Sequence, residues 1–332
     1  ALDYGDADGN AWHRSILCKR RDRVLMQRRV LLLALVLDLL FGDPPNRLHP
    51  VAWMGRFIGW LQKRITVRGR ILPFISGAGI TLSGAVVFGG AAWILSRTLR
   101  WLPGGWILSA VLLKLTFSLR GLNDAAHTVE AALQNDDLAE ARRLASWHLV
   151  SRDTSALTAS QVAAAAVESV AENTSDGVIA PLFFYALGGL PGAYAYRYVQ
   201  TCDSMLGYRD AQHEWSGKFP ARLDDLLNLL PSRVTALLFV VTAPLVEGNA
   251  GKAWRIWQRD GNLTASPNAG QPMSAAAGAL GVELEKVGHY TLGEGLRQPS
   301  PADISRARRL MIAASLLFVG LLTMIARGRH DD

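Results

Sequence analysis

The chain has 332 residues, of which 50% are hydrophobic and only 19% are charged, against roughly 25% charged in an average soluble domain. This shortage of charge, with a mean hydropathy of +0.15, argues against an ordinary soluble protein and indicates a membrane protein with sizeable polar loops. The net charge of +7 does not indicate a nucleic-acid partner, because no RNA- or DNA-binding motif accompanies it and the basic residues flank apolar runs. Cys18 and Cys202 are far apart and lack metal-ligand spacing, which favours free thiols.

Residues 1–29 are polar and then strongly basic, and we set them apart as an N-terminal appendage. Residues 30–332 are expected to form one membrane-embedded domain. Its first apolar run, 30–41, is too short for a simple span, so we expect it to insert partly or to pack against other helices. Asp43 follows in an Asp-Pro-Pro sequence, which is either a stiff turn or part of a site.

Later apolar runs have the length or composition of membrane segments. Residues 71–96 carry no charge and can span with tilt, and residues 101–119 contain Lys114, which either snorkels or faces protein. A short run at 234–245 is bounded by prolines, and the last run is 310–326. We therefore predict an all-α, polytopic membrane protein with four to six membrane segments.

The run from 178 to 196 is apolar but is interrupted by Gly188–Gly192, a sequence that breaks a helix. Broken backbone at membrane depth survives only where protein or water covers it, so we predict a re-entrant hairpin. Such a hairpin brings the polar segments 120–177 and 197–228 to one face. We expect these two segments to form the site, in a helical cytoplasmic portion of the protein.

Before this break lies a helix with an acidic face. Thr158 and Gln161 form a capping-box start, and Gly177 is the predicted stop. Spacing of four residues stacks side chains on one face, and no Lys or Arg lies four residues away to neutralise the stack. The face is either a wet acidic edge or a site for a divalent cation, most simply Mg²⁺ with a nucleotide, held by Glu168, Glu172 and Asp176.

Several long motifs, in order, resemble one family. They are DLLFGDPPNRLHPVAWMGRFI, VESVAENTSDGVIAPLFFYALGGLPGAYAYR, DSMLGYR, ARLDDLLNLLPSR and SPNAGQPMSAAAGALGVELEK. This set is similar to the adenosylcobinamide-phosphate synthases, the CobD/CbiB family of cobalamin biosynthesis. Two positions depart from the pattern expected of that family, because Gln200 stands in place of Asn and Cys202 in place of an aliphatic residue.

The resemblance implies an ATP-dependent ligase of the inner (cytoplasmic) membrane, with its site facing the cytoplasm. The reaction joins adenosylcobyric acid to an aminopropanol or its phosphate, and we expect (R)-1-aminopropan-2-ol O-phosphate, the route for which Mg²⁺ and ATP are required; the corrinoid is a substrate. The partners expected are these small molecules, the lipid bilayer and other membrane-bound enzymes of cobalamin assembly, and no nucleic acid. No Walker A pattern is present, so ATP would bind without a P-loop.

The residue types that this chemistry needs are present. We expect catalytic roles for Glu168, Glu172, Asn173, Asp176 and Asp203. We expect substrate or phosphate binding by Asp43, Arg197, Arg209, Arg222, Asp224, Asp225 and Asn268, the last on the resemblance alone. The alternative is an AmpE-like membrane sensor without catalysis, which would not need this density of acids and arginines.

Overall fold

The computed structural model describes residues 26–64, 69–150, 152–207 and 214–328, so most of the predicted appendage lies outside the described residues. A helix covers residues 26–41. The elements that follow are α2 (Pro50–Gln62), α3 (Ile71–Leu99), α4 (Gly105–Lys114), α5 (Leu119–Gln134), α6 (Leu138–His148), α7 (Ala159–Thr174), a π-helical turn (Ser175–Ile179), α8 (Ala180–Leu206), α9 (Lys218–Thr242), a 3₁₀ turn (Ala243–Val246), α10 (Ala250–Asp260), α11 (Gly270–Leu280), β1 (Leu284–Lys286), β2 (Tyr290–Leu292) and α12 (Pro301–Gly328).

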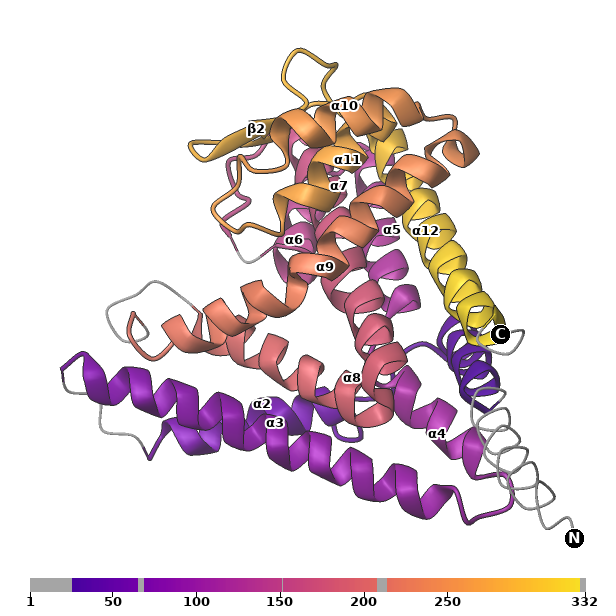
Figure 1. The fold of residues 1–332 in the computed structure, drawn as a ribbon. Helices are drawn as coiled ribbons and strands as arrows, with labels where there is room; N and C mark the ends of the chain where they lie inside the picture. The colour runs from indigo at the N-terminus through magenta and orange to yellow at the C-terminus, as the bar shows by residue number, and fades with distance from the viewer. Residues whose placement is uncertain (1–25, 65–68, 151, 208–213, 329–332) are drawn as a thin grey trace, which may run out of the picture.

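Helices long and apolar enough to cross a membrane dominate the fold. Five such segments are found in the described residues, namely Ile71–Leu99, Gly105–Gln134, Ala159–Leu206, Lys218–Val246 and Pro301–Met324. On α3, which lies along the lower edge of Figure 1, Ile71 and Val86 are 75% and 73% exposed, as suits a lipid-facing helix. In the described part of the chain, strands are limited to the antiparallel β1–β2 hairpin. The prediction of an all-α, multi-pass membrane protein is confirmed.

A buried ion cluster ties the N-terminal helix to α4 and α5. Asp38 is fully buried, and its Oδ2 accepts the backbone N–H groups of Leu119 at 3.1 Å and Arg120 at 2.9 Å. Asp38 thereby caps α5 from another helix, since the first N–H groups of a helix lack partners within it. Lys114 lies 3.5 Å from Asp38 and also bonds Asp43. Lys114 therefore faces protein, which decides between the two alternatives for this lysine.

The acidic helix α7 begins as predicted and ends differently. Thr158 and Gln161 form the capping box, with the Thr158 backbone N–H donating to Gln161 Oε1 at 3.0 Å. The stop predicted at Gly177 is wrong. Gly177 does not adopt the positive φ of a C-terminal glycine cap, and the chain continues through the π-helical turn into α8. Asp176 lies inside that turn, a local geometry that is frequent at functional sites.

The break predicted in the next apolar run is confirmed. Gly189 has φ 65° and ψ −157°, and α8 turns sharply there into a second arm (Figure 1). The arms still touch, because the rings of Phe184 and Tyr196 stack with centroids 4.9 Å apart. Tyr196 also donates a hydrogen bond to the Asp176 carbonyl oxygen at 3.2 Å. The hairpin thus returns the second arm to the acidic end of α7.

The short apolar run predicted at 234–245 is longer than expected. α9 runs unbroken from Lys218 through Pro231 to Thr242, so Pro231 does not bound the segment. Pro231 is buried among packed helices, where a missing backbone N–H is tolerated. α9 follows the loop after the second arm of α8 and rises toward α10 and α11 (Figure 1). Its first turns therefore lie close to the end of α8, where the site is found.

Small side chains pack the helices behind the site. α11 is buried along its whole length, and so is most of α7, which is rich in alanine. A Cβ added at Gly278 would lie 2.6 Å from the Lys252 carbonyl oxygen, so α10 and α11 approach too closely for a side chain there. This tight packing holds α7 as a rigid wall for the carboxylates that it carries.

Candidate active site

Three adjoining cavities open along α7 and α8, and we refer to them together as the cleft. The acidic cavity, of about 570 Å³, is lined by Ser146, Trp147, His148, Leu149, Val150, Glu172, Asn173, Asp176, Gln200, Asp203, Ser204, Gly207 and Asp224. The Asp43 cavity, of about 470 Å³, shares His148, Leu149, Asn173, Gln200 and Ser204 with it. The hairpin pocket, of about 130 Å³, lies beside the β1–β2 hairpin and shares Leu149, Val150 and Glu172 with the acidic cavity. The shared residues place the three cavities side by side.

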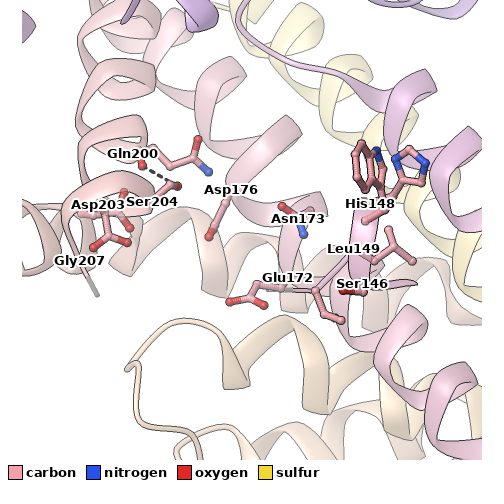
Figure 2. A pocket seen from close by; sticks show the side chains of 13 residues that line it. Ser146, His148, Leu149, Glu172, Asn173, Asp176, Gln200, Asp203, Ser204 and Gly207 are labelled. Atoms are coloured by element: carbon pink, nitrogen blue, oxygen red, sulfur yellow. Dashed lines mark hydrogen bonds between the residues drawn. The ribbon is translucent and has the colours of Figure 1, made fainter. Parts of the chain in front are cut away.

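Four carboxylates from four elements line the acidic cavity. Glu172 comes from α7, Asp176 from the π-helical turn, Asp203 from the end of α8 and Asp224 from α9. Figure 2 shows Asp176 between Asp203 and Glu172, with the three carboxylates turned toward a common space. Within the described residues none of these four forms an ion pair, and the buried Asp224 Oδ1 has no hydrogen-bond partner. Such a concentration of carboxylate oxygens is chemically suited to a cation.

The described residues contain no group of three or more His, Cys, Asp or Glu side chains that are already arranged to bind a metal ion. The trio expected to hold Mg²⁺ is divided between two spaces. Asp176 lies in the acidic cavity, Glu168 lines the hairpin pocket, and Glu172 lines both. Mg²⁺ is commonly held by one or two carboxylates with substrate phosphates and water, so the acidic cavity still offers suitable oxygens.

One predicted cation points into this cleft. Arg197 lines the Asp43 cavity, and its Nη1 donates to Gln200 Oε1 at 2.6 Å. Its Nε is buried with no hydrogen-bond partner. The described residues provide no ion pair for Arg197, so the salt bridge to Asp203 that would make it purely structural does not form. A guanidinium with an unused donor beside a cavity is suited to an anionic ligand.

Asp43 is held at the far end of the cleft. Lys114 and Ser118 both donate to it, and His49 Nε2 lies 3.6 Å away. Burial alone would raise the pKa of Asp43, but the hydrogen bonds from His49, Lys114 and Ser118 together hold it below its ordinary value. By contrast, burial raises the pKa of Asp38, which shares Lys114. Asp43 is thus a fixed anion facing the Asp43 cavity.

Glu168 differs from its expected state. The sequence contains no cation at helical spacing to neutralise it, yet Arg152 Nη2 reaches Glu168 Oε2 at 3.3 Å from the segment before α7. The expectation of a fully unpaired acidic face is therefore wrong at Glu168. Its other oxygen, Oε1, is buried without a hydrogen-bond partner. Burial, together with the charges of the neighbouring carboxylates, raises the pKa of Tyr290 in the same pocket, so its hydroxyl stays protonated.

Three further predicted residues lie outside or behind the cleft. Asn268 is buried, donates to the Asp225 carbonyl oxygen at 2.7 Å and accepts from Ser232, so it supports α9 and does not line any of the three cavities. Asp225 accepts a hydrogen bond from Ser266 at 3.2 Å. Arg222 is exposed on α9 and lines none of the three cavities. Arg209 lies outside the described residues.

Other cleft residues had no strong sequence signal. His148 ends α6 and lines the acidic and Asp43 cavities. Arg152, Lys286 and Tyr290 complete the hairpin pocket from segments far apart in the chain. Only Lys286 falls within a motif quoted above, as the last residue of the segment that starts at Ser266.

Comparison with known proteins identifies the family. A model of the CobD/Cbib protein family matches residues 31–311. The chain belongs to the CobD/CbiB family. It is 46% identical to "Cobalamin biosynthesis protein CobD" of Dehalococcoides mccartyi (strain CBDB1), over 87% of this chain and 94% of that relative. It is 40% identical to "Cobalamin biosynthesis protein CbiB" of Salmonella typhimurium (strain LT2), over 87% of this chain and 94% of that relative.

A third relative, "Probable cobalamin biosynthesis protein CobD" of Methanothermobacter thermautotrophicus, is 44% identical over 90% of this chain and 96% of its own length. Family membership supports a role in cobalamin biosynthesis. No solved structure matches the chain.

The two departures from the expected family pattern have different surroundings. Gln200 lines two cavities and accepts a hydrogen bond from Arg197, so it helps to orient the guanidinium. Cys202 is a fully buried free cysteine on the opposite side of the helix turn. Only the Gln200 departure therefore touches the candidate site.

Proposed function

We propose that this CobD/CbiB family member is a membrane-embedded ligase that forms an amide bond between adenosylcobyric acid and (R)-1-aminopropan-2-ol O-phosphate, with ATP. A carboxylate does not react with an amine at neutral pH, so ATP must first activate it as an acyl phosphate or an adenylate. The amine then displaces the phosphate or AMP. The observation that carries the proposal is that a cavity lined by four carboxylates without ion pairs adjoins a cavity lined by Arg197, whose Nε has no hydrogen-bond partner.

The acidic cavity fits magnesium on chemical grounds. Its donors are carboxylate oxygens, and Asp224 Oδ1 is buried without a partner. One or two of Asp176, Asp203 and Asp224 would hold the ion together with water and the phosphates of ATP, and the ion would supply positive charge against the phosphate oxygens. Asp176, Asp203 and Asp224 lie close enough to interact electrostatically with one another. Without a bound cation, these like charges would also repel the negatively charged triphosphate of ATP.

Arg197 supplies the fixed positive charge of the cleft. Gln200 orients the guanidinium group. Its Nε has no hydrogen-bond partner, so it could donate to a phosphate oxygen of a bound ligand. Asn173, whose amide donates to Ser169, lines both large cavities and presents its carbonyl oxygen to polar groups there. Arg197 and Asn173 would thus bind and orient the reactants. Binding and orientation are expected to account for most of the rate enhancement at a site that activates a carboxylate.

We further propose that the cleft faces the cytoplasm and that the membrane is the inner (cytoplasmic) membrane. ATP is available on that side, and the hairpin at Gly189 returns the chain to the side from which α7 leaves. The corrinoid and the aminopropanol phosphate would enter from the same side. Other membrane-bound enzymes of cobalamin assembly are the partners that this location suggests.

The deciding experiment is a reconstituted reaction. The purified protein, in detergent or lipid, receives adenosylcobyric acid, aminopropanol phosphate and Mg-ATP, and mass spectrometry follows the amide product together with ADP or AMP. We expect product only when ATP and Mg²⁺ are both present. A folded protein that binds no ATP and forms no amide would contradict the proposal and would favour the AmpE-like sensor.

A further inference from the structure

The hairpin pocket is chemically distinct from the two larger cavities. Its lining combines two cations with two carboxylates, from the segment before α7, from α7 itself and from the β1–β2 hairpin. The lining residues are Leu149, Val150, Arg152, Glu168, Ser169, Glu172, Lys286 and Tyr290. A pocket that offers both signs of charge suits a ligand that carries both signs.

Two of these charged groups have unused bonding capacity. Glu168 is 5% exposed, and its Oε1 is buried with no hydrogen-bond partner, although Arg152 holds its Oε2. Lys286 acts electrostatically on Glu168 and Glu172, but within the described residues its ammonium group forms no ion pair or hydrogen bond. A buried polar atom without a partner is costly, so a ligand that satisfies these groups gains affinity.

The size of the pocket limits what can bind there. Its volume of about 130 Å³ equals that of roughly four waters at ~30 Å³ each. Sites for drug-sized ligands typically measure about 300–1,000 Å³, so neither a nucleotide nor a corrinoid fits in this space. The acidic cavity, at about 570 Å³, lies within that larger class. The pocket is therefore a site for a small polar molecule.

We infer that the hairpin pocket binds a small zwitterion, an amine that carries a phosphate. This inference rests on the ligase proposed above and identifies the pocket as the subsite of its amine substrate. Lys286 and Arg152 bind the phosphate, and Glu168 with Glu172 binds the ammonium group. Tyr290, whose hydroxyl donates a weak hydrogen bond to Met273 Sδ at 3.9 Å in this structure, would donate to a phosphate oxygen instead.

The position of Glu172 fixes the orientation of this substrate. Glu172 lines both the hairpin pocket and the acidic cavity, so it lies at their junction. An ammonium group held at Glu172 points into the acidic cavity, where the activated carboxylate would lie. The phosphate then lies at the hairpin end, away from Arg197, which leaves Arg197 for the phosphates of ATP.

The test compares two amines in a charge-removing variant. Lys286→Met keeps the length of the side chain and removes its charge, and Lys286→Arg retains the charge. We expect Lys286→Met to raise the KM for aminopropanol phosphate roughly 10- to 150-fold, as for loss of one charge-assisted hydrogen bond. The KM for unphosphorylated aminopropanol and for ATP should change by less than about fivefold, and Lys286→Arg should behave like the wild type. Lys63→Met, at an exposed lysine outside the cleft, is the matched control.

Calorimetric binding of aminopropanol phosphate to the purified protein, without ATP or corrinoid, separates this inference from the ligase proposal. Binding that weakens in Lys286→Met supports the pocket even if the wild type forms no amide. The inference is overturned, and the ligase proposal is not, if the wild type forms the amide but Lys286→Met changes the KM for the two amines equally or changes neither KM. Should Lys286→Met not fold, competition in the wild type decides. Inorganic phosphate should displace aminopropanol phosphate but not aminopropanol, and equal displacement of both overturns the inference.

Discussion

Replacing Arg197 by lysine tests the cleft most directly. The substitution keeps the positive charge but removes the Nε donor, which is buried without a partner in this structure, and the planar fork suited to phosphate. One charge-assisted hydrogen bond contributes about 1.5–3 kcal/mol. At 1.4 kcal/mol per tenfold, the KM for Mg-ATP should rise roughly 10- to 150-fold. The KM for either amine should change little, because the amine is assigned to the hairpin pocket.

The assay is steady-state amide formation with each substrate varied in turn, together with the melting temperature of each variant. Arg255→Lys, at an exposed arginine on α10, controls for a general effect of the exchange. Equal losses for ATP and both amines, accompanied by a lower melting temperature, would mean that Arg197 has only a structural role. A rise in KM confined to aminopropanol phosphate would instead place the amine's phosphate at Arg197 and refute our assignment.

Three further predictions concern the acids, the buried ion cluster and the hairpin. Asp176→Asn should lower kcat by about 100-fold or more while membrane insertion is unchanged, and near-normal turnover would remove Asp176 from the site. Lys114→Met should destabilise the protein by about 3–5 kcal/mol in thermal unfolding, since it leaves Asp38 buried and unpaired, and adding Asp38→Asn should restore part of the loss. Single cysteines at Ser160 and Leu226, in a background without other thiols, should both be labelled from the cytoplasmic side of sealed vesicles. Labelling from opposite sides would contradict the hairpin.

The local sequence was sufficient for features that depend on neighbouring residues. The capping box at Thr158 and Gln161 depends on side chains three residues apart, and the bend at Gly189 depends on a backbone conformation that glycine adopts readily. Apolar runs predicted the membrane helices because burial in lipid requires length and low charge, both of which are visible in the sequence. Stops were harder to predict: Gly177 and Pro231 both lie within continuous helical structure, because tertiary packing overrides local helix-breaking preferences.

Only the tertiary structure decided which charges meet. Spacing along α7 predicted a stack of carboxylates, but the cation that neutralises Glu168 is Arg152, which no helical periodicity connects to it. Lys286 reaches the same pocket from a hairpin more than a hundred positions later, and Asn268 turns away from the cleft to support the backbone of Asp225. Electrostatic and hydrogen-bonding partners are selected by distance in space. The sequence by itself therefore determined the membrane helices, the bend and the acids, whereas packing of distant segments divided those acids between an acidic cavity and a small pocket of mixed charge.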